Sequence, residues 1–307
     1  MSVWLQSALA PRGPEAAAIA EITWVLVAAG AVIFAIVLVI AALALFRPHA
    51  WLGSTRLIVA GGIVFPVVVL SALLVYALLA APRQAAAGPA DVVVEVVGHQ
   101  WWWEVNYLDD SGAPDFTTAN EIHIPVGREV ELRLHSADVL HSFWVPALAG
   151  KLDLIPGKDN RLRLAADQAG TFRGQCAEYC GGPHAQMALF VVAEDPARFD
   201  AWRTAQREPQ RGIADPQATE GRQLFLAHCG SCHTLRGTVA EGKLGPDLTH
   251  FGSRIALGAG IRPNHTGALA GWIAGNQRMK PGNLMPEIRD LDGDELRTLS
   301  DWLGTLK

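Results

Sequence analysis

Two stretches without a charged side chain constrain this sequence more than any other feature. Residues 22–46 and 57–82 contain 25 and 26 uncharged, mostly apolar residues. A helix needs about 20 such residues to cross a bilayer, whereas a core helix of a globular domain is shorter and apolar on one face. The sequence therefore predicts a transmembrane helix hairpin, which together with a short N-terminal segment occupies residues 1–87.

The loop between the two stretches begins at Arg47 and ends at Arg56, and it contains no acidic residue. Before the first stretch, Arg12 is accompanied by two glutamates. Because basic loop residues stay on the cytoplasmic side, the loop is expected in the cytoplasm and both chain ends outside. The first ten residues lack a basic segment, so they do not form a signal peptide. Pro66 is expected to kink the second helix.

Composition indicates that folded domains follow this hairpin. Half of the residues are hydrophobic and 18% are charged, which is too apolar for an ordinary soluble protein and too charged for one that lies wholly in the membrane. The hydrophobic content excludes a disordered chain. The 25 basic residues stand against 30 acidic ones, and the absence of a basic excess excludes a nucleic-acid partner.

Residues 88–205 have the pattern of an all-β domain. Short β-branched segments alternate with turns that contain Gly, Pro and Asp, which is typical of a sandwich of about 100 residues. The clearest segments are 91–97, 121–127, 129–135, 161–165 and 185–193.

The end of this segment concentrates metal ligands. Cys176, Cys180, His184 and Met187 lie within twelve residues, and His141 precedes Cys176 by 35. Thiolates, imidazoles and a thioether suit copper better than magnesium or calcium. Two thiolates this close can bridge two copper ions, with one histidine for each and with the methionine and a backbone carbonyl in the remaining positions. A structural zinc site with two cysteines and two histidines is the alternative, but zinc does not require the methionine.

The other two cysteines belong to a different motif. Cys229, Cys232 and His233 form a CxxCH sequence, which attaches c-type haem through two thioethers and places the histidine under the iron. Such an iron usually takes methionine as its second ligand. Met285 lies in a Pro–Gly loop and is favoured over Met279, which lacks one. The motif belongs to a helical segment, residues 218–307, that follows an expected linker at 206–217.

Residues 5–205 resemble subunit II of haem–copper cytochrome c oxidases. The segments 99–107, 138–157 and 176–187 carry the resemblance, and the fused CxxCH segment resembles the arrangement in caa-type oxidases. The implied fold is multi-domain. A transmembrane hairpin, with helices at about 22–46 and 57–82, precedes an all-β cupredoxin-like Greek-key sandwich at 88–205. An all-α class I cytochrome c domain follows at 218–307, and its last helix is expected from a capping box at Asp292.

The resemblance also implies roles for the candidate residues. The dinuclear copper A centre would take the carbonyl of Glu178 as one ligand, while the Glu178 side chain can reach a magnesium ion shared with subunit I. Trp101 would be the electron-entry residue. The carbonyl of Pro246 would accept the ring N–H of the haem histidine. The remaining implied ligands are His141, Cys176, Cys180, His184 and Met187 for copper, and Cys229, Cys232, His233 and Met285 for one covalently bound haem c.

The implied function is electron transfer. The subunit would accept electrons at the haem, pass them to copper A and then to subunit I, where oxygen is reduced to water with proton pumping. Implied partners are oxidase subunits I and III and an upstream cytochrome or membrane redox complex. The implied location is the bacterial inner membrane, with both globular domains on the periplasmic side.

Three other functions share part of this pattern. The electron-entry subunit of a copper-A-containing nitric oxide reductase is the main alternative. A copper-delivery protein would not need a haem domain, and a quinol oxidase subunit II lacks the copper ligands. One feature departs from the family: residues 51–62, at the start of the second helix, lack the acidic residue found in many members.

Overall fold

The computed structural model describes residues 5–47, 49–80, 89–209 and 216–307. These residues divide into two compact units, one made of Ala18–Pro89 and the other of Met1–Ala17 with Ala90–Lys307. Two helical spans, Pro14–Phe46 and Thr55–Leu79, are long and apolar enough to cross a membrane. The second span consists of α2 (Thr55–Val59), the π-helical turn η2 (Ala60–Val64) and α3 (Phe65–Ala80), after the short 3-10 helix η1 (Ala50–Gly53).

The expected helix bounds are corrected at both starts. Helix α1 (Pro14–Phe46) begins eight residues before residue 22, because Pro14 fits the first turn of a helix and Glu15 interacts favourably with the helix dipole. The second span begins at Thr55, where the Ser54 side chain accepts a hydrogen bond from the Leu57 amide. The π-helical turn η2 ends two residues before Pro66, and a kink at Pro66 itself stays a prediction. Residues 81 and 82 lie outside the described part of the chain.

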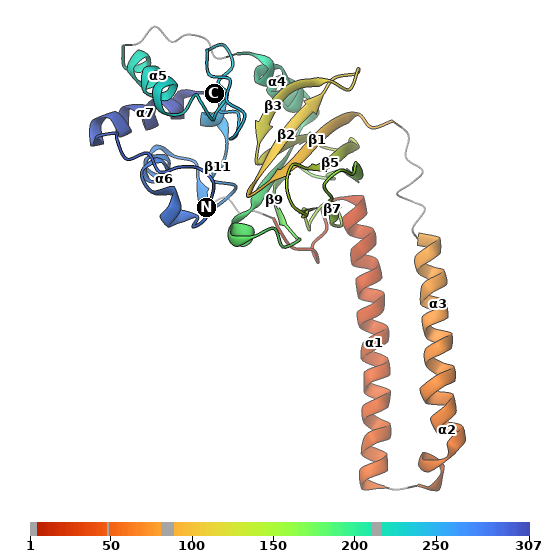
Figure 1. The fold of residues 1–307 in the computed structure, drawn as a ribbon. Coiled ribbons are helices and arrows are strands. Elements are labelled where there is room, and N and C mark those ends of the chain that lie inside the picture. Colours follow the sequence, from red (N-terminus) through yellow and green to blue (C-terminus); the bar gives the residue numbers. More distant parts are fainter. Residues whose placement is uncertain (1–4, 48, 81–88, 210–215) are drawn as a thin grey trace. The chain divides into compact units, whose positions relative to one another are not determined.

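The segment after the hairpin forms the expected β-sandwich of two five-stranded sheets (Figure 1). The pairs β1–β5 and β4–β10 are parallel and the other pairs are antiparallel, so neighbours in space are often distant in sequence. One sheet has the order β3 (Pro114–Ala119), β2 (Trp102–Leu108), β1 (Val92–His99), β5 (Val130–Ser136), β8 (Asn160–Leu164). The other has the order β4 (Glu121–Pro125), β10 (Ala188–Glu194), β9 (Gly170–Cys176), β6 (His141–Trp144), β7 (Leu152–Leu154).

The core of the sandwich extends to the cysteine pair. Strand β1 alternates buried and half-buried positions, as expected when one face of a strand packs inside. Cys176, Cys180 and Met187 belong to the same buried cluster as the inward side chains of the strands. Helix α4 (Pro196–Arg207) adds Phe199 to this core. Because α4 extends to Arg207, the expected linker 206–217 begins inside a helix; residues 210–215 lie outside the described part.

The C-terminal domain is built on three helices, α5 (Pro216–His228), α6 (Thr266–Met279) and α7 (Gly293–Thr305). The capping box is confirmed: Asp292 accepts from the Glu295 amide, and the Glu295 side chain accepts from the Asp292 amide. Helix α7 packs on α5 through Trp302 and Phe225, whose ring centroids are 5.6 Å apart. The domain is not purely helical, because β11 (Ala256–Leu257) and β12 (Arg262–Pro263) pair in a small hairpin after the 3-10 turn η5 (Phe251–Ser253).

A buried ionic cluster joins β4 to the end of β10. His123 lies between the carboxylates of Glu121 and Glu194, and Trp202 of α4 stacks on its ring at 4.0 Å. Burial by itself would lower the pKa of His123, but the hydrogen bonds and charges of the two carboxylates raise it above the ordinary value of 6.5. The His123 side chain therefore binds both carboxylates through its two ring nitrogens and so links the two strands.

We expect His123→Gln to destabilise the protein in a pH-dependent way. A raised pKa stabilises the fold fully below pH 6.5, and this contribution is lost as pH rises through the folded-state pKa. The loss at low pH should be about 2 kcal/mol, as for a buried charged hydrogen bond. Melting temperatures of the full chain against pH test this, with His135→Gln on the half-exposed sheet face as the control. A wild-type advantage that grows with pH would contradict the assignment.

Candidate functional site

The β-sandwich brings its sulfur and imidazole ligands together at one end of the second sheet. Cys176 ends β9, and the chain then turns through Cys180 and the 3-10 helix η4 (Gly182–Gln186) before β10 begins. His141 begins β6, whose Phe143 is paired with Cys176 across the sheet. The ligands that lie 35 residues apart in sequence are therefore neighbours because β6 and β9 are adjacent strands.

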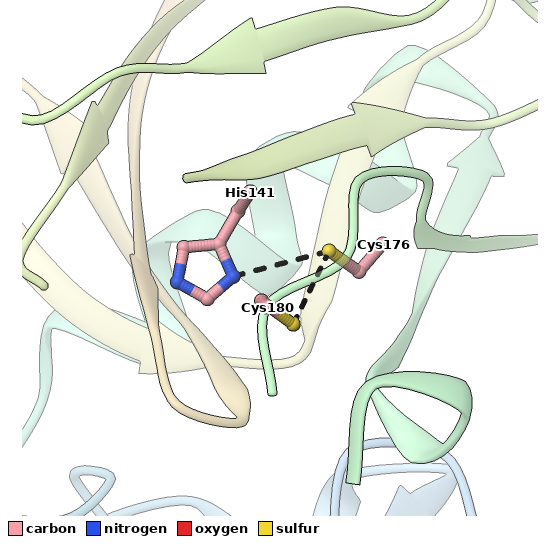
Figure 2. A group of neighbouring side chains, drawn as sticks. All are labelled: His141, Cys176 and Cys180. Carbon is pink, nitrogen blue, oxygen red and sulfur yellow. Dashed lines mark hydrogen bonds between the residues drawn. The ribbon is translucent and has the colours of Figure 1, made fainter. Parts of the chain in front are cut away.

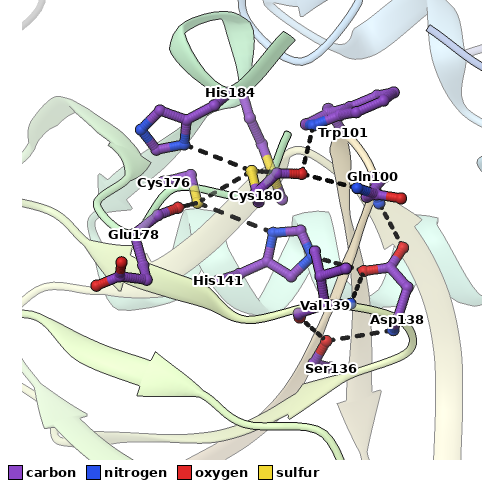
Figure 3. A network of polar contacts seen from close by, with 11 residues as sticks. Gln100, Trp101, Ser136, Asp138, Val139, His141, Cys176, Glu178, Cys180 and His184 are labelled. Atoms are coloured by element: carbon purple, nitrogen blue, oxygen red, sulfur yellow. Dashed lines mark hydrogen bonds and ion pairs between the residues drawn. The ribbon is translucent and has the colours of Figure 1, made fainter. Parts of the chain in front are cut away.

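The donor atoms converge on the two sulfurs. The Sγ atoms of Cys176 and Cys180 are 3.7 Å apart, and the two cysteines form no disulfide. Donor atoms of His141, Cys176 and Cys180 all lie within 4.8 Å of one another (Figure 2). Further contacts are His141 Nδ1 to Cys176 Sγ at 3.8 Å, the Glu178 carbonyl to Cys176 Sγ at 3.2 Å, His184 Nδ1 to Cys180 Sγ at 3.4 Å, and Met187 Sδ to Cys180 Sγ at 3.9 Å (Figure 3).

The protonation of the pair suits a soft metal. The hydrogen bond shared with Cys180 is the largest effect on Cys176 and lowers its pKa to about 4, while the same sharing raises the pKa of Cys180. Cys176 is therefore the sulfur of the pair that loses its proton more easily. Thiolates bind metals in competition with protons. Two sulfurs, two imidazoles, a thioether and a carbonyl fit a pair of copper ions, and Met187, 1% exposed, has no place in a zinc Cys2His2 set.

Neighbouring groups orient these ligands. Asp138 accepts a hydrogen bond at 2.8 Å from Nε2 of His141, which leaves Nδ1 facing the sulfurs, the usual arrangement for a metal-binding histidine. Gly98 on β1 makes room for the imidazole, since a Cβ there would lie 2.9 Å from His141 Cδ2. The side-chain amide Nε2 of Gln100 and the indole Nε1 of Trp101 both donate to the Cys180 carbonyl, at 2.8 and 2.9 Å (Figure 3).

The CxxCH motif lines a separate cavity of about 380 Å³, within the usual range of roughly 300–1,000 Å³ for cofactor sites. His233 and Met285 both line it, whereas Met279 does not. His233 Nδ1 donates to the Pro246 carbonyl at 2.8 Å, as expected from the resemblance. Gly245 permits this approach, because a Cβ there would lie 2.5 Å from the His233 ring. Burial lowers the pKa of His233, so its imidazole is neutral, the form that binds iron.

Two further features fit a haem. Arg254 lines the cavity and is 9% exposed, and its Nε has no hydrogen-bond partner among the described residues. An unpartnered guanidinium N–H in a cavity suits a carboxylate group, and haem carries carboxylate side chains. Burial raises the pKa of Cys229 to about 12, so this sulfur is a neutral thiol.

The expected site residues form two groups, one around the cysteine pair and one around the cavity, and the two groups meet at Trp101. The copper ligand candidates surround the cysteine pair, and the haem ligand candidates line the cavity. Trp101 belongs to both sites, because its indole reaches Cys180 while its side chain, with Trp102, also lines the cavity. His99, His123 and His135 pair with carboxylates instead of joining the sulfurs. The segment 99–107 comprises the end of β1, a tight turn and most of β2.

The sequence did not predict the residues that orient the ligands or line the cavity without being ligands themselves. Asp138 had a local signal, since it lies three residues before His141. Arg254 and the buried Lys280, which contacts the Trp101 carbonyl, had none, because both depend on packing between segments far apart in the chain.

Comparisons with known proteins match both globular domains. Residues 108–194 match the family model of the cytochrome c oxidase subunit II periplasmic domain, and residues 218–307 match that of cytochrome c. A cytochrome c oxidase subunit 2 of Alkalihalophilus pseudofirmus is 39% identical over 72% of this chain and 63% of its own length. One of Bacillus sp. is 34% identical over 70% and 62%. The match therefore spans less than two thirds of either relative.

Among solved structures, the periplasmic domain of subunit II of cytochrome oxidase of Bradyrhizobium japonicum is 30% identical, with a TM-score of 0.37. The aligned part covers 39% of this chain and 96% of that one.

Proposed function

The chain belongs to the cytochrome c oxidase subunit II family and carries a fused cytochrome c domain, and we propose that it is the electron-entry subunit of a haem–copper oxidase. The C-terminal domain receives single electrons, the β-sandwich passes them on, and oxygen is reduced in subunit I. When bound, haem c and a pair of copper ions supply the redox-active groups. The two apolar spans anchor the subunit in the bacterial inner membrane, beside subunits I and III, with both domains on the periplasmic side.

One observation supports this proposal above the others: the turn between β1 and β2 connects the two candidate sites, because Gln100 and Trp101 both line the cavity and both donate to the Cys180 carbonyl. Trp101 lines the cavity, and its Nε1 donates at 2.9 Å to the carbonyl of Cys180. A hydrogen bond to a ligand residue gives a short, continuous path between two redox centres. Neither a copper-delivery protein nor a separate zinc domain would need such a connection.

The remaining residues position and protect the centres. Asp138 fixes the His141 ring, and Pro246 fixes the His233 ring. The Glu178 carbonyl faces the sulfurs, while its carboxylate points away from them and is available to a cation shared with subunit I (Figure 3). An electron donor, a cytochrome or a membrane redox complex, is expected to reduce the C-terminal domain.

Replacing Trp101 tests the proposal. Trp101→Phe keeps an aromatic ring but loses the donor to Cys180, and we expect electron transfer from the haem domain to the copper domain to slow by about tenfold or more, as with other losses of positioning contacts. Flash reduction of the haem in the full chain, with optical detection of copper reduction, measures this rate. The matched control is Trp202→Phe in α4, which lies away from both sites. Equal rates in both variants would remove Trp101 from the path.

A further inference from the structure

Lys280 occupies an unusual position between the two globular domains. It follows the last residue of α6 and precedes Met285 by five residues, and it is 3% exposed. Its Nζ donates to the Trp101 carbonyl at 2.6 Å and to the Gly258 carbonyl at 3.1 Å. One ammonium group therefore joins the methionine loop, the turn before β12 and the β1–β2 hairpin.

Burying this group has a cost that stability alone does not explain. Removing an ammonium from water is expensive unless a negative charge accompanies it. Among the described residues Lys280 forms hydrogen bonds to carbonyls and no ion pair with a carboxylate, and the charge of the Cys180 sulfur offsets only part of the effect of burial. Burial lowers the pKa of Lys280 to about 7. A methionine side chain would fill similar space without this cost. The Nζ donor is useful here because it binds two carbonyls from different domains at once.

The contact also belongs to a series of hydrogen bonds that runs from the methionine loop through Trp101 to Cys180. Lys280 binds the carbonyl of Trp101, and the indole of the same residue binds the carbonyl of Cys180. Other contacts between the domains surround it. The Gln186 side chain donates to the Met279 carbonyl at 3.1 Å, and the Ala188 amide donates to the Ala259 carbonyl at 2.9 Å. Lys280 is the basic side chain in this group of contacts.

We propose that Lys280 is a positioning residue that holds the methionine loop of the cytochrome domain against the Trp101 backbone, so that electron transfer occurs from one docked arrangement of the two domains. This inference rests on the proposed function. A tethered domain without such a contact would have to find its docking position anew for each electron, and a displacement of about 1 Å between reacting groups can cost on the order of a hundredfold in rate.

Lys280→Met in the full chain, with haem and copper bound, tests the proposal. The variant keeps the apolar stem and loses the ammonium. We expect the haem and copper spectra to remain unchanged, because neither ligand set includes Lys280. Hydrogen–deuterium exchange in residues 99–103 and 255–261 should become about tenfold faster as the docked state opens, and haem-to-copper transfer should slow by at least about tenfold. Lys307→Met, which removes an exposed charge from the same domain, should change neither.

Three results would overturn the proposal. The first is unchanged exchange in both segments. The second is faster exchange with an unchanged transfer rate. The third is loss of the methionine-ligated haem spectrum in both Lys280→Met and Lys280→Gln, which retains a donor; Lys280 would then serve only the folding of its own loop. Failure of the proposed function is distinguishable, because the wild-type chain itself would then show no haem-to-copper transfer, while the exchange comparison would still report on docking.

Discussion

Cys176→Ser is expected to abolish the paired copper centre and reduce oxidase turnover to background. The Cys176 sulfur contacts an imidazole nitrogen, a carbonyl oxygen and the second sulfur. A serine hydroxyl stays protonated at neutral pH and is a hard ligand that cannot bridge two soft ions. Loss of a residue that hydrogen-bonds to a metal ligand lowers metal affinity roughly 10–100-fold. Loss of a bridging ligand itself should lower the affinity further.

The matched control for this prediction is Cys229→Ser. The two cysteines differ in role, so this variant should keep the copper signal and alter only the haem, which would retain a single thioether to Cys232. Copper content and low-temperature EPR of the two purified variants decide the matter. A two-copper signal that persists in Cys176→Ser would show that the bridging sulfur has been misassigned.

Met285→Ala is expected to change the haem more than any other substitution outside the CxxCH motif. The iron would lose its thioether ligand, and axial ligands set haem potentials over a range of about 0.8 V. We expect the potential to fall by on the order of 0.1 V or more, since methionine ligation raises it. The reduced haem would then still pass electrons onward, but ordinary donors would no longer reduce it.

Met279→Leu provides the control, because the two methionines are six residues apart and only Met285 lines the cavity. Met279 instead lies close to Gly271 on its own helix. Redox titration and the optical spectrum of both variants measure the effect. A normal haem spectrum in Met285→Ala together with a disturbed one in Met279→Leu would show that Met279, and not Met285, is the haem ligand.

Features that depend on neighbouring residues were predictable from the sequence. The two membrane spans follow from uncharged stretches longer than a bilayer requires, and the Asp292 capping box and the CxxCH motif are local patterns. Ligand spacing in residues 176–187 indicated a soft-metal site because one turn between two strands holds most of the donors. Even so, the start of α1 was placed too late, because absence of charge marks a membrane span and not the helix that contains it.

Features that depend on packing between distant segments were not predictable in the same way. The His123 cluster requires β4 and β10 to be paired, although its members are 71 residues apart. Contact between Lys280 and Trp101 spans 179 residues and two domains. The sequence indicated two redox sites but not that one tryptophan borders both, since neither periodicity nor spacing relates the β1–β2 hairpin to the methionine loop.

Low-temperature EPR of the full chain, matured with haem and supplied with copper, tests the central assignment most directly. We expect a signal from one unpaired electron shared between two copper nuclei, beside a low-spin ferric haem with histidine and methionine ligands, and metal analysis should give two copper ions for each haem. A mononuclear copper signal, or zinc in place of copper, would contradict the assignment of Cys176 and Cys180 as bridging ligands and leave a haem protein with a different metal site.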